Sequence, residues 1–164
     1  PEDLILLNNL KKNIFIESNL SWFDLRLLNH INNSNRSRFK IIARSIYASG
    51  ILKIILNGEL NAMESFQKYD VRSTWDINKL LLENKEDIKR IQNVKQILSE
   101  SSLSEFGFSL FPILSSLLFG IIIGPLSIKE LLDSEKSNNK KFSNEIQKDL
   151  REIINIYNPE LLSS

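Results

Sequence analysis

Four cationic residues in the first third of the chain have the type and spacing most typical of a binding site for anions. Arg36, Lys40 and Arg44 recur every fourth residue, and Arg38 lies among them. On a helix this spacing places the three charges on one face. Such a row is suited to phosphate, anionic lipid headgroups or an acidic protein segment. The alternative interpretation is a solvated helix face without a ligand.

The residues that most enzymes need are scarce. The chain has no cysteine and a single histidine, His30, which excludes disulfides, thiol catalysis and metal sites rich in Cys or His. We find no zinc-protease, serine-hydrolase, phosphate-loop or dinucleotide-binding motif. Glu83 and Asp87 lie one helical turn apart, but Lys85 and Lys89 stand beside them, so solvated ion pairs are expected. We therefore predict no catalytic residue, no cofactor and no metal ligand, and a helical nuclease stays only as a remote alternative.

The elements expected to position these residues are helices. Five glycines and four prolines interrupt 164 residues, and apolar residues recur mostly at three- and four-residue spacing. This pattern predicts an all-α bundle of six to eight helices with no sheet beyond a stray pair of strands. The expected helices cover residues 2–15, 21–31, 36–57, 60–69, 77–100 and 143–157.

Several helix ends can be assigned from capping residues. The sequences at 21–24 and 73–76 have a Ser followed three residues later by an Asp, which resembles a capping box. Gly58 stands where a helix C-cap is expected, and Ser143 begins the last helix. Trp22 and Trp75 each follow a capping Ser or Thr, which favours roles in packing at helix starts.

The most unusual segment is Gly107–Ile128, which has 22 consecutive residues without a charge. Thirteen of them are Leu, Ile or Phe. A helix of this length spans roughly 33 Å, enough to cross a hydrocarbon core of about 30 Å. Pro112 and the pair Gly124-Pro125 divide the segment, which favours instead a short, buried central helix.

Both interpretations stay open at this point, and both place the same side chains away from water. The residues that we assign to a membrane span or a core helix are Phe108, Phe111, Leu114, Leu117, Leu118, Ile121 and Ile122. We expect three regions within one domain: an amphipathic bundle over 1–101, the apolar segment over 102–133, and a polar loop with a final helix over 134–164.

Composition narrows the classes of partner. The net charge of +1 provides no field that would attract nucleic acid. The 23 Ile, 18 Asn and 14 Lys are typical of an AT-rich genome, so part of the composition reflects codon bias. Pro1 stands where an initiator Met is expected, which suggests a trimmed chain.

These observations favour a non-catalytic interaction protein that is associated with or inserted into a membrane through residues 107–128. The alternative is a cytoplasmic, soluble helical partner or regulatory domain in which this segment is buried, with insertion only under some conditions. We expect a protein partner in both cases, and membrane lipid in the first.

Overall fold

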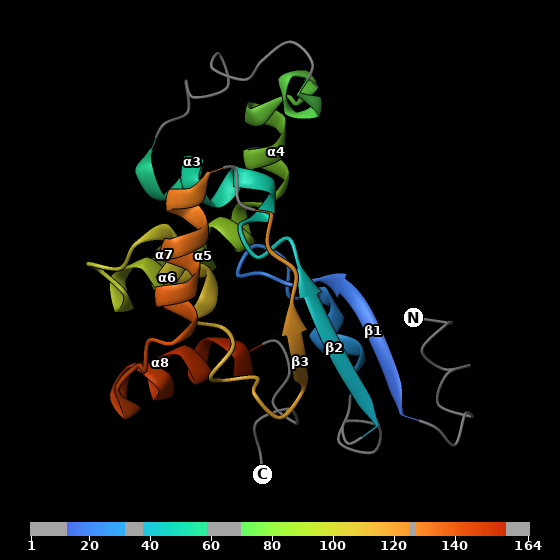
Figure 1. Cartoon of the computed structure of the whole chain (residues 1–164). Helices are drawn as coiled ribbons and strands as arrows, with labels where there is room; N and C mark the ends of the chain where they lie inside the picture. The colour runs from blue at the N-terminus through green and yellow to red at the C-terminus, as the bar shows by residue number, and fades with distance from the viewer. Residues whose placement is uncertain (1–12, 32–37, 59–69, 125–126, 157–164) are drawn as a thin grey trace.

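We describe residues 13–31, 38–58, 70–124 and 127–156 of a computed structural model. The strands are β1 (Ile14–Asn19), β2 (Phe39–Arg44) and β3 (Leu118–Ile121). The α-helices are α3 (Ile51–Asn57), α4 (Ile77–Glu83), α5 (Lys85–Ile97), α6 (Leu103–Phe108), α7 (Ile128–Asn138) and α8 (Asn144–Asn155). Short 3-10 helices are η1 (Arg26–His30), η2 (Ala48–Gly50) and η4 (Val71–Thr74). This is a mixed α/β chain with a three-stranded parallel sheet, so the all-α prediction is wrong (Figure 1).

All three strands lie at least partly in sequence that we predicted to be helical. In β2 the side chains of Phe39, Ile41 and Ala43 are buried, and the residues between them are not. This alternation has the period of a strand, and β-branched isoleucine prefers the extended backbone. The apolar spacing of Phe39, Ile42 and Ile46 also matches a helix, which is why the sequence pattern was ambiguous there. Of the expected helix over 2–15, residues 2–12 lie outside the described residues, and Ile14 and Phe15 belong to β1.

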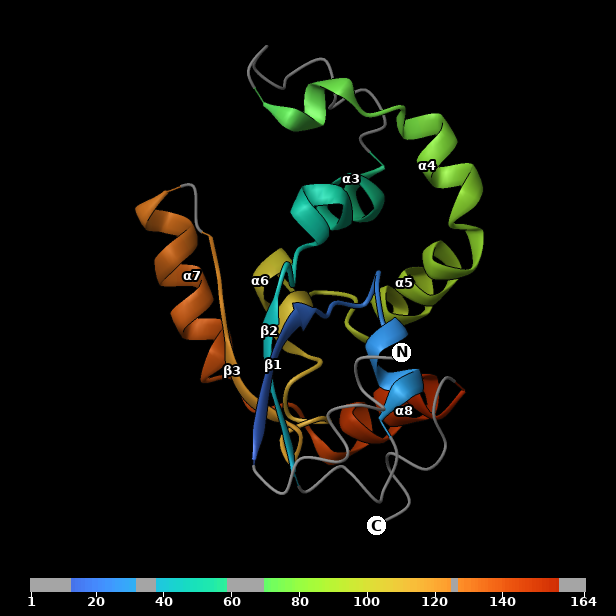
Figure 2. The same cartoon turned by 90° about the vertical axis from the view of Figure 1, so that its right-hand side faces the viewer.

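The sheet has the order β1-β2-β3, and all neighbouring strands run parallel. In β1 and β2 the register pairs Ile14 with Phe39 and Asn19 with Arg44. Seen edge-on in Figure 2, α3, α5, α8 and the 3-10 helix η1 lie on one side of the sheet and α7 lies on the other. Right-handed crossovers explain this arrangement. Because the strands are ordered in the sheet as they are in the sequence, the connections from β1 to β2 and from β2 to β3 must cross the same face of the sheet.

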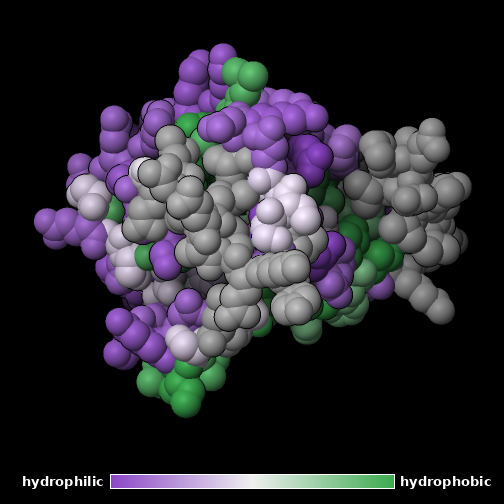
Figure 3. Space-filling model, turned by 90° about the horizontal axis from the view of Figure 1, so that it is seen from above, coloured by the Kyte–Doolittle hydropathy of each residue, from purple (hydrophilic) through white to green (hydrophobic). Residues whose placement is uncertain are grey.

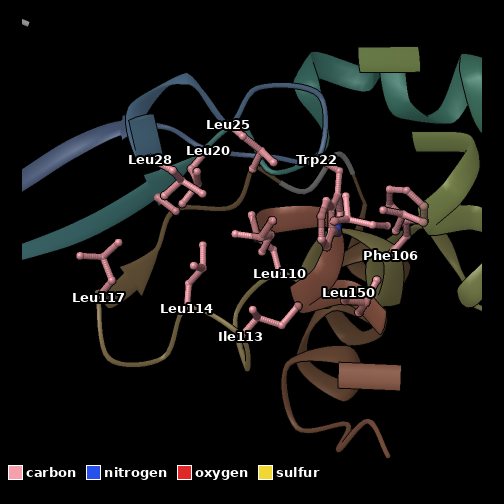
Figure 4. Packing of buried hydrophobic residues seen from close by; sticks show 14 of the residues in the cluster. Leu20, Trp22, Leu25, Leu28, Phe106, Leu110, Ile113, Leu114, Leu117 and Leu150 are labelled. Atoms are coloured by element: carbon pink, nitrogen blue, oxygen red, sulfur yellow. The ribbon is translucent and has the colours of Figure 1, made fainter. Parts of the chain in front are cut away.

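The core fills the space between the sheet and the helices behind it. Trp22, Leu25 and Leu28 come from the connection between β1 and β2, and they meet Phe106 and Leu110 from α6 and the turn after it (Figure 4). Ile91 and Val94 of α5 join the same cluster, as do Leu150 and Ile154 of α8. The apolar side of α5 is thus buried against the core.

The uncharged segment does not form one helix. It begins in α6, passes through turns over residues 109–117, forms β3 and ends at the start of α7. We find no helix in the described residues that combines the length and the apolarity needed to cross a bilayer. The predictions of a transmembrane helix and of a central core helix are therefore both wrong, and residues 125–126 of the segment lie outside the described residues. Pro112 and the β-branched run 121–123 favour this break into turns and a strand.

The candidate residues of this segment differ in exposure. Phe108, Leu114 and Leu117 are buried, whereas Phe111, Leu118 and Ile121 are half-buried and Ile122 is exposed. The segment therefore supplies core on one side of the sheet and apolar surface on the other.

Several predicted helix ends agree with the structure. Gly58 caps α3 with a left-handed backbone, at a φ of 69°, which confirms the expected C-cap. The Ser143 side chain accepts a hydrogen bond from the Ile146 amide, which confirms the start of α8. The expected helix over 77–100 begins after Asp76 and is divided at Asn84 into α4 and α5. The expected helix over 60–69 lies outside the described residues.

We predict that Leu117→Lys strongly destabilises the fold. Leu117 is fully buried directly before β3, and its carbonyl accepts a hydrogen bond from the Ile41 amide. An unpaired buried ammonium should lower the free energy of unfolding by about 3 kcal/mol or more. Urea denaturation followed by circular dichroism measures this loss. Phe119→Lys, two residues later on the exposed side, is the control and should cost less than about 1 kcal/mol; equal losses would contradict the burial of Leu117.

Candidate functional site

One face of the parallel sheet is left without a helix over β1 and β2 in the described part of the chain (Figure 1). We call this the open face. Two aromatic rings lie on it: Phe15 of β1 is 54% exposed and Phe119 of β3 is 65% exposed. Their ring centroids are 4.8 Å apart in an edge-to-face arrangement. The residues of the open face are Phe15, Glu17, Asn19, Lys40, Ile42, Arg44 and Phe119.

Two of the four predicted anion-binding cations share this face. Lys40 and Arg44 lie on the same side of β2 because four residues are two full periods of a strand. The Lys40 Nζ donates a hydrogen bond to the Ser116 carbonyl at 3.3 Å, and the Arg44 Nε lies 3.6 Å from a Glu17 carboxylate oxygen. Arg38 precedes the strand, and Arg36 lies outside the described residues. The cations are therefore positioned by a strand instead of the expected helix.

Helix α7 adds exposed apolar side chains beside the open face. Ile128, Leu131 and Leu132 are all exposed. In Figure 3 a hydrophobic protrusion appears at the lower edge of the view, the side on which α7 lies. The Ser127 side chain caps this helix by accepting a hydrogen bond from the Glu130 amide. The helix therefore starts at the end of the apolar segment, and its own exposed apolar side chains extend the apolar surface of that segment.

A groove of ≈ 600 Å³ separates α7 from β3 and the turns before it. Its apolar lining comes from Phe108, Phe111, Pro112, Leu118, Phe119, Ile121, Ile123 and Leu131. At its rim, Lys140 forms an ion pair with Glu105 at 2.8 Å. Burial by itself raises the pKa of Glu105, but hydrogen bonds and the charge of Lys140 together outweigh it and hold this pKa below its ordinary value. Lys140 and Glu105 thereby neutralise each other. The groove is apolar along β3 and the turns before it, and its polar lining comes from Ser115 and, on α7, from Ser134, Glu135, Ser137 and Asn138.

Tyr47 holds α7 in place. Its hydroxyl and the Ser134 hydroxyl lie 2.9 Å apart in a hydrogen bond, and Ser134 is buried. The Tyr47 ring also lies against Gly107 of α6, where an added Cβ would approach the Cε1 atom to 2.8 Å. Only glycine leaves room for the ring at this position, so one aromatic side chain joins the loop after β2 to two helices.

The loop after β2 has an unusual backbone. Ser45, Ala48 and Ser49 have φ values of 57°, 49° and 54°, a region that residues other than glycine rarely occupy. Arg72 braces this loop, because its guanidinium donates a hydrogen bond to the Ser49 carbonyl. Arg72 is held in turn by a bidentate ion pair with Asp70. Side-chain and backbone hydrogen bonds from Arg72 lower the pKa of Asp70 to about 2.

A buried arginine fixes the connection between β1 and β2. Arg90 of α5 is 4% exposed, and it donates hydrogen bonds to the Trp22 and Phe23 carbonyls and to the Asp87 carboxylate. The Trp22 indole donates to the Ser109 hydroxyl at 2.9 Å. This network supports the fold, and the fully buried Trp22 has the packing role that we expected for it.

The other candidates from the sequence contribute no site. Asp87 pairs with Arg90, and Glu83 lies 3.9 Å from Lys79, so both acids form ion pairs, but with other partners than Lys85 and Lys89. His30 is exposed at the end of η1. In the described residues no group of three acidic or histidine side chains is placed to hold a metal ion. Sequence reasoning missed Phe15 and Phe119, although the run Ile14-Phe15-Ile16, made of β-branched and aromatic residues, is a strand signal.

We predict that Arg90→Ala lowers the free energy of unfolding by about 2–4 kcal/mol, because two buried carbonyls and a carboxylate lose their donor. Thermal and urea denaturation measure the effect. Lys89→Ala, one residue earlier, is the matched control: Lys89 is exposed and pairs only with Glu86 on the surface, so its removal should leave stability almost unchanged. A similar effect of both variants would show that Arg90 is not a structural anchor.

We also predict that the Asp70 carboxyl titrates at a pKa of about 2, compared with an ordinary value of 3.8. The depressed pKa means that the ion pair supports the folded state above about pH 4 and loses this effect as the pH falls toward 2. Carboxyl ¹³C NMR follows the titration directly. In Arg72→Gln the pKa should rise only part of the way to 3.8, because the backbone amide of residue 72 still donates to Asp70. An unchanged pKa in the variant would contradict the pairing.

Comparison with known proteins identifies no family for this chain. We found no match among protein-family models, curated proteins or solved structures.

Proposed function

We propose that this chain is a non-catalytic interaction protein that binds an amphipathic helix of a partner protein across the open face, beside α7. The main support is the parallel sheet itself. Parallel sheets are buried on both faces in almost all proteins, because helices cover each side. In this chain the described helices cover one face of the sheet, and on the other face only α7 lies beside β3. The open face over β1 and β2 carries two exposed phenylalanines. A helix supplied by a partner would complete the second layer.

The distribution of exposed apolar side chains also supports this proposal. Eight large hydrophobic residues are exposed in the described part of the chain. Six of them belong to β1, to β3 with the residue after it, and to α7: Phe15, Phe119, Ile122, Ile128, Leu131 and Leu132. Single exposed apolar residues are normal on a protein surface, but a contiguous group typically marks a binding surface.

The charges around the aromatic pair favour one kind of helix. Lys40 and Arg44 stand on β2 beside Phe15 and Ile42, and Glu17 is the only acidic residue of the open face. A partner helix with apolar residues at positions i, i+3, i+4 and i+7 would cover the rings. Acidic residues along its flank would pair with the two cations and set its orientation.

Association with a membrane surface is the second candidate, carried by the exposed Ile128, Leu131 and Leu132 of α7. Apolar side chains at one end of a helix can enter the interface region of a bilayer without spanning it. This candidate uses α7 alone and makes no use of the aromatic pair on the sheet, so the two proposals differ in the residues that they require.

A display selection of helical peptides on the intact chain tests the proposal. We expect the selected peptides to have an apolar stripe at helical spacing flanked by Asp or Glu. Their affinity should fall at least about tenfold on the double variant Phe15→Ser/Phe119→Ser, since each ring contributes on the order of 1 kcal/mol or more at such an interface. Fluorescence anisotropy measures this affinity.

Leu82→Ser is the control for this experiment. Leu82 is 63% exposed, nearly as much as Phe119, but it lies on α4, away from the open face. This variant should bind the peptides as tightly as the parent chain. Peptides without acidic flanks, or equal binding to the double variant, would overturn the partner-helix proposal. Co-sedimentation with lipid vesicles that depends on Ile128 and Leu131 but not on Phe15 would favour the membrane surface instead.

A further inference from the structure

The carboxyl ends of β2 and β3 are a second place where the fold creates a site. The chain leaving β2 turns toward α3 on the covered side of the sheet, whereas the chain leaving β3 turns toward α7 on the other side (Figure 2). Neighbouring parallel strands whose connections leave in opposite directions open a crevice between them. In open α/β sheets, ligands bind in such crevices, outside the carboxyl ends of the strands.

The structure has a hollow of ≈ 320 Å³ at this point. Arg44, Ser45 and Ser49 line it from the loop after β2, and Ile122 and Ile123 line it from the end of β3. Its volume lies within the range of small-molecule sites in proteins. The lining therefore combines one cation and two hydroxyls on one side with an apolar wall on the other.

The backbone of this loop is held in a costly conformation. A positive φ is strained for residues other than glycine, and such residues cluster at functional sites. Three occur here within five residues. The Ala48 amide closes the turn on the Ser45 carbonyl, and no backbone carbonyl of the described chain accepts a hydrogen bond from the amides of Ile46 and Tyr47, two residues that also line the hollow.

The charge of the hollow selects the ligand class. Arg44 is half-exposed, and its nearest acidic partner, Glu17, is 3.6 Å away, which is a long separation for an ion pair. A guanidinium with free donors binds phosphate oxygens by parallel hydrogen bonds. Serine hydroxyls and turn amides add donors around a tetrahedral anion.

We propose that the hollow binds a small molecule carrying a phosphate monoester, with the phosphate against Arg44 and the organic part against Ile122 and Ile123. The two proposals share Arg44, but this one uses the end of the sheet and does not need the aromatic pair. Lys40 lies four residues before Arg44 on the same face of β2 but does not line the hollow, so it serves as a matched control cation.

NMR titration of the intact chain with inorganic phosphate and with glycerol 3-phosphate tests this site. We expect shifts concentrated in the amides of residues 44–50 and 122–124, and tighter binding of glycerol 3-phosphate than of inorganic phosphate. Arg44→Gln should weaken binding at least about tenfold. Lys40→Gln should change it by less than about twofold.

Three outcomes would overturn the proposal: no shifts at these amides, equal weakening by Arg44→Gln and Lys40→Gln, or equal binding of acetate at matched ionic strength. Vesicles containing phosphatidic acid, also a phosphate monoester, identify the source of the phosphate. Binding to glycerol 3-phosphate without Arg44-dependent binding to the vesicles supports a free small molecule, and Arg44-dependent vesicle binding overturns that assignment. The double variant Phe15→Ser/Phe119→Ser separates the two proposals: it should lose helix-peptide binding and keep its affinity for glycerol 3-phosphate, whereas Arg44→Gln should weaken both.

Discussion

The handedness of parallel crossovers is the constraint on which the rest of this structure depends. Because the strands pair in sequence order, both connections return on the same side of the sheet, and most of the helices are committed to that side. Chain that precedes β1 or follows β3 is free of this constraint, and α7 is what the described residues place on the other face. The one-sided core, the open face and the divergence of the chain at β2 and β3 all follow from this single topological choice.

The one-sided core in turn explains why polar contacts are needed inside it. The connection between β1 and β2 has few regular backbone hydrogen bonds, because its only helix, η1, is a brief 3-10 helix in the described residues. Arg90 supplies donors to two carbonyls of this connection, and the Trp22 indole is bonded to Ser109 across the core. Buried polar groups of this kind must be satisfied, but once satisfied they fix one arrangement of otherwise interchangeable apolar side chains.

The sequence predicted the helical half of the fold better than the sheet. Ser143 and Gly58 are local caps, so their effect depends on neighbouring residues alone and can be read from the chain. Asp76 was expected to close a capping box begun by Ser73, but it is itself the N-cap of α4. The strands depend on pairing between segments far apart, and Ile-rich sequence satisfies both helical and extended periods. Of the side chains of the uncharged segment that were expected to lie away from water, Leu114 and Leu117 are buried, but Ile122 is exposed. The division of this segment into turns, a strand and a helix start required knowledge of β2, the strand against which it pairs. Of the candidate surface, Lys40 and Arg44 were identified by charge, whereas Phe15 and Phe119 come together only in the folded sheet.

Tyr47 shows how closely the two candidate surfaces are connected. Its backbone belongs to the strained loop that lines the hollow, its ring requires Gly107 in α6, and its hydroxyl holds Ser134 in α7. The loop conformation therefore determines where α7 lies, and α7 forms one wall of the apolar groove. Strain in this loop has to be balanced by the contacts around it, and the Arg72 brace and the Tyr47 bond are two such contacts. The position of α7 beside the open face thus depends on the loop over residues 45–50, which follows the carboxyl end of β2.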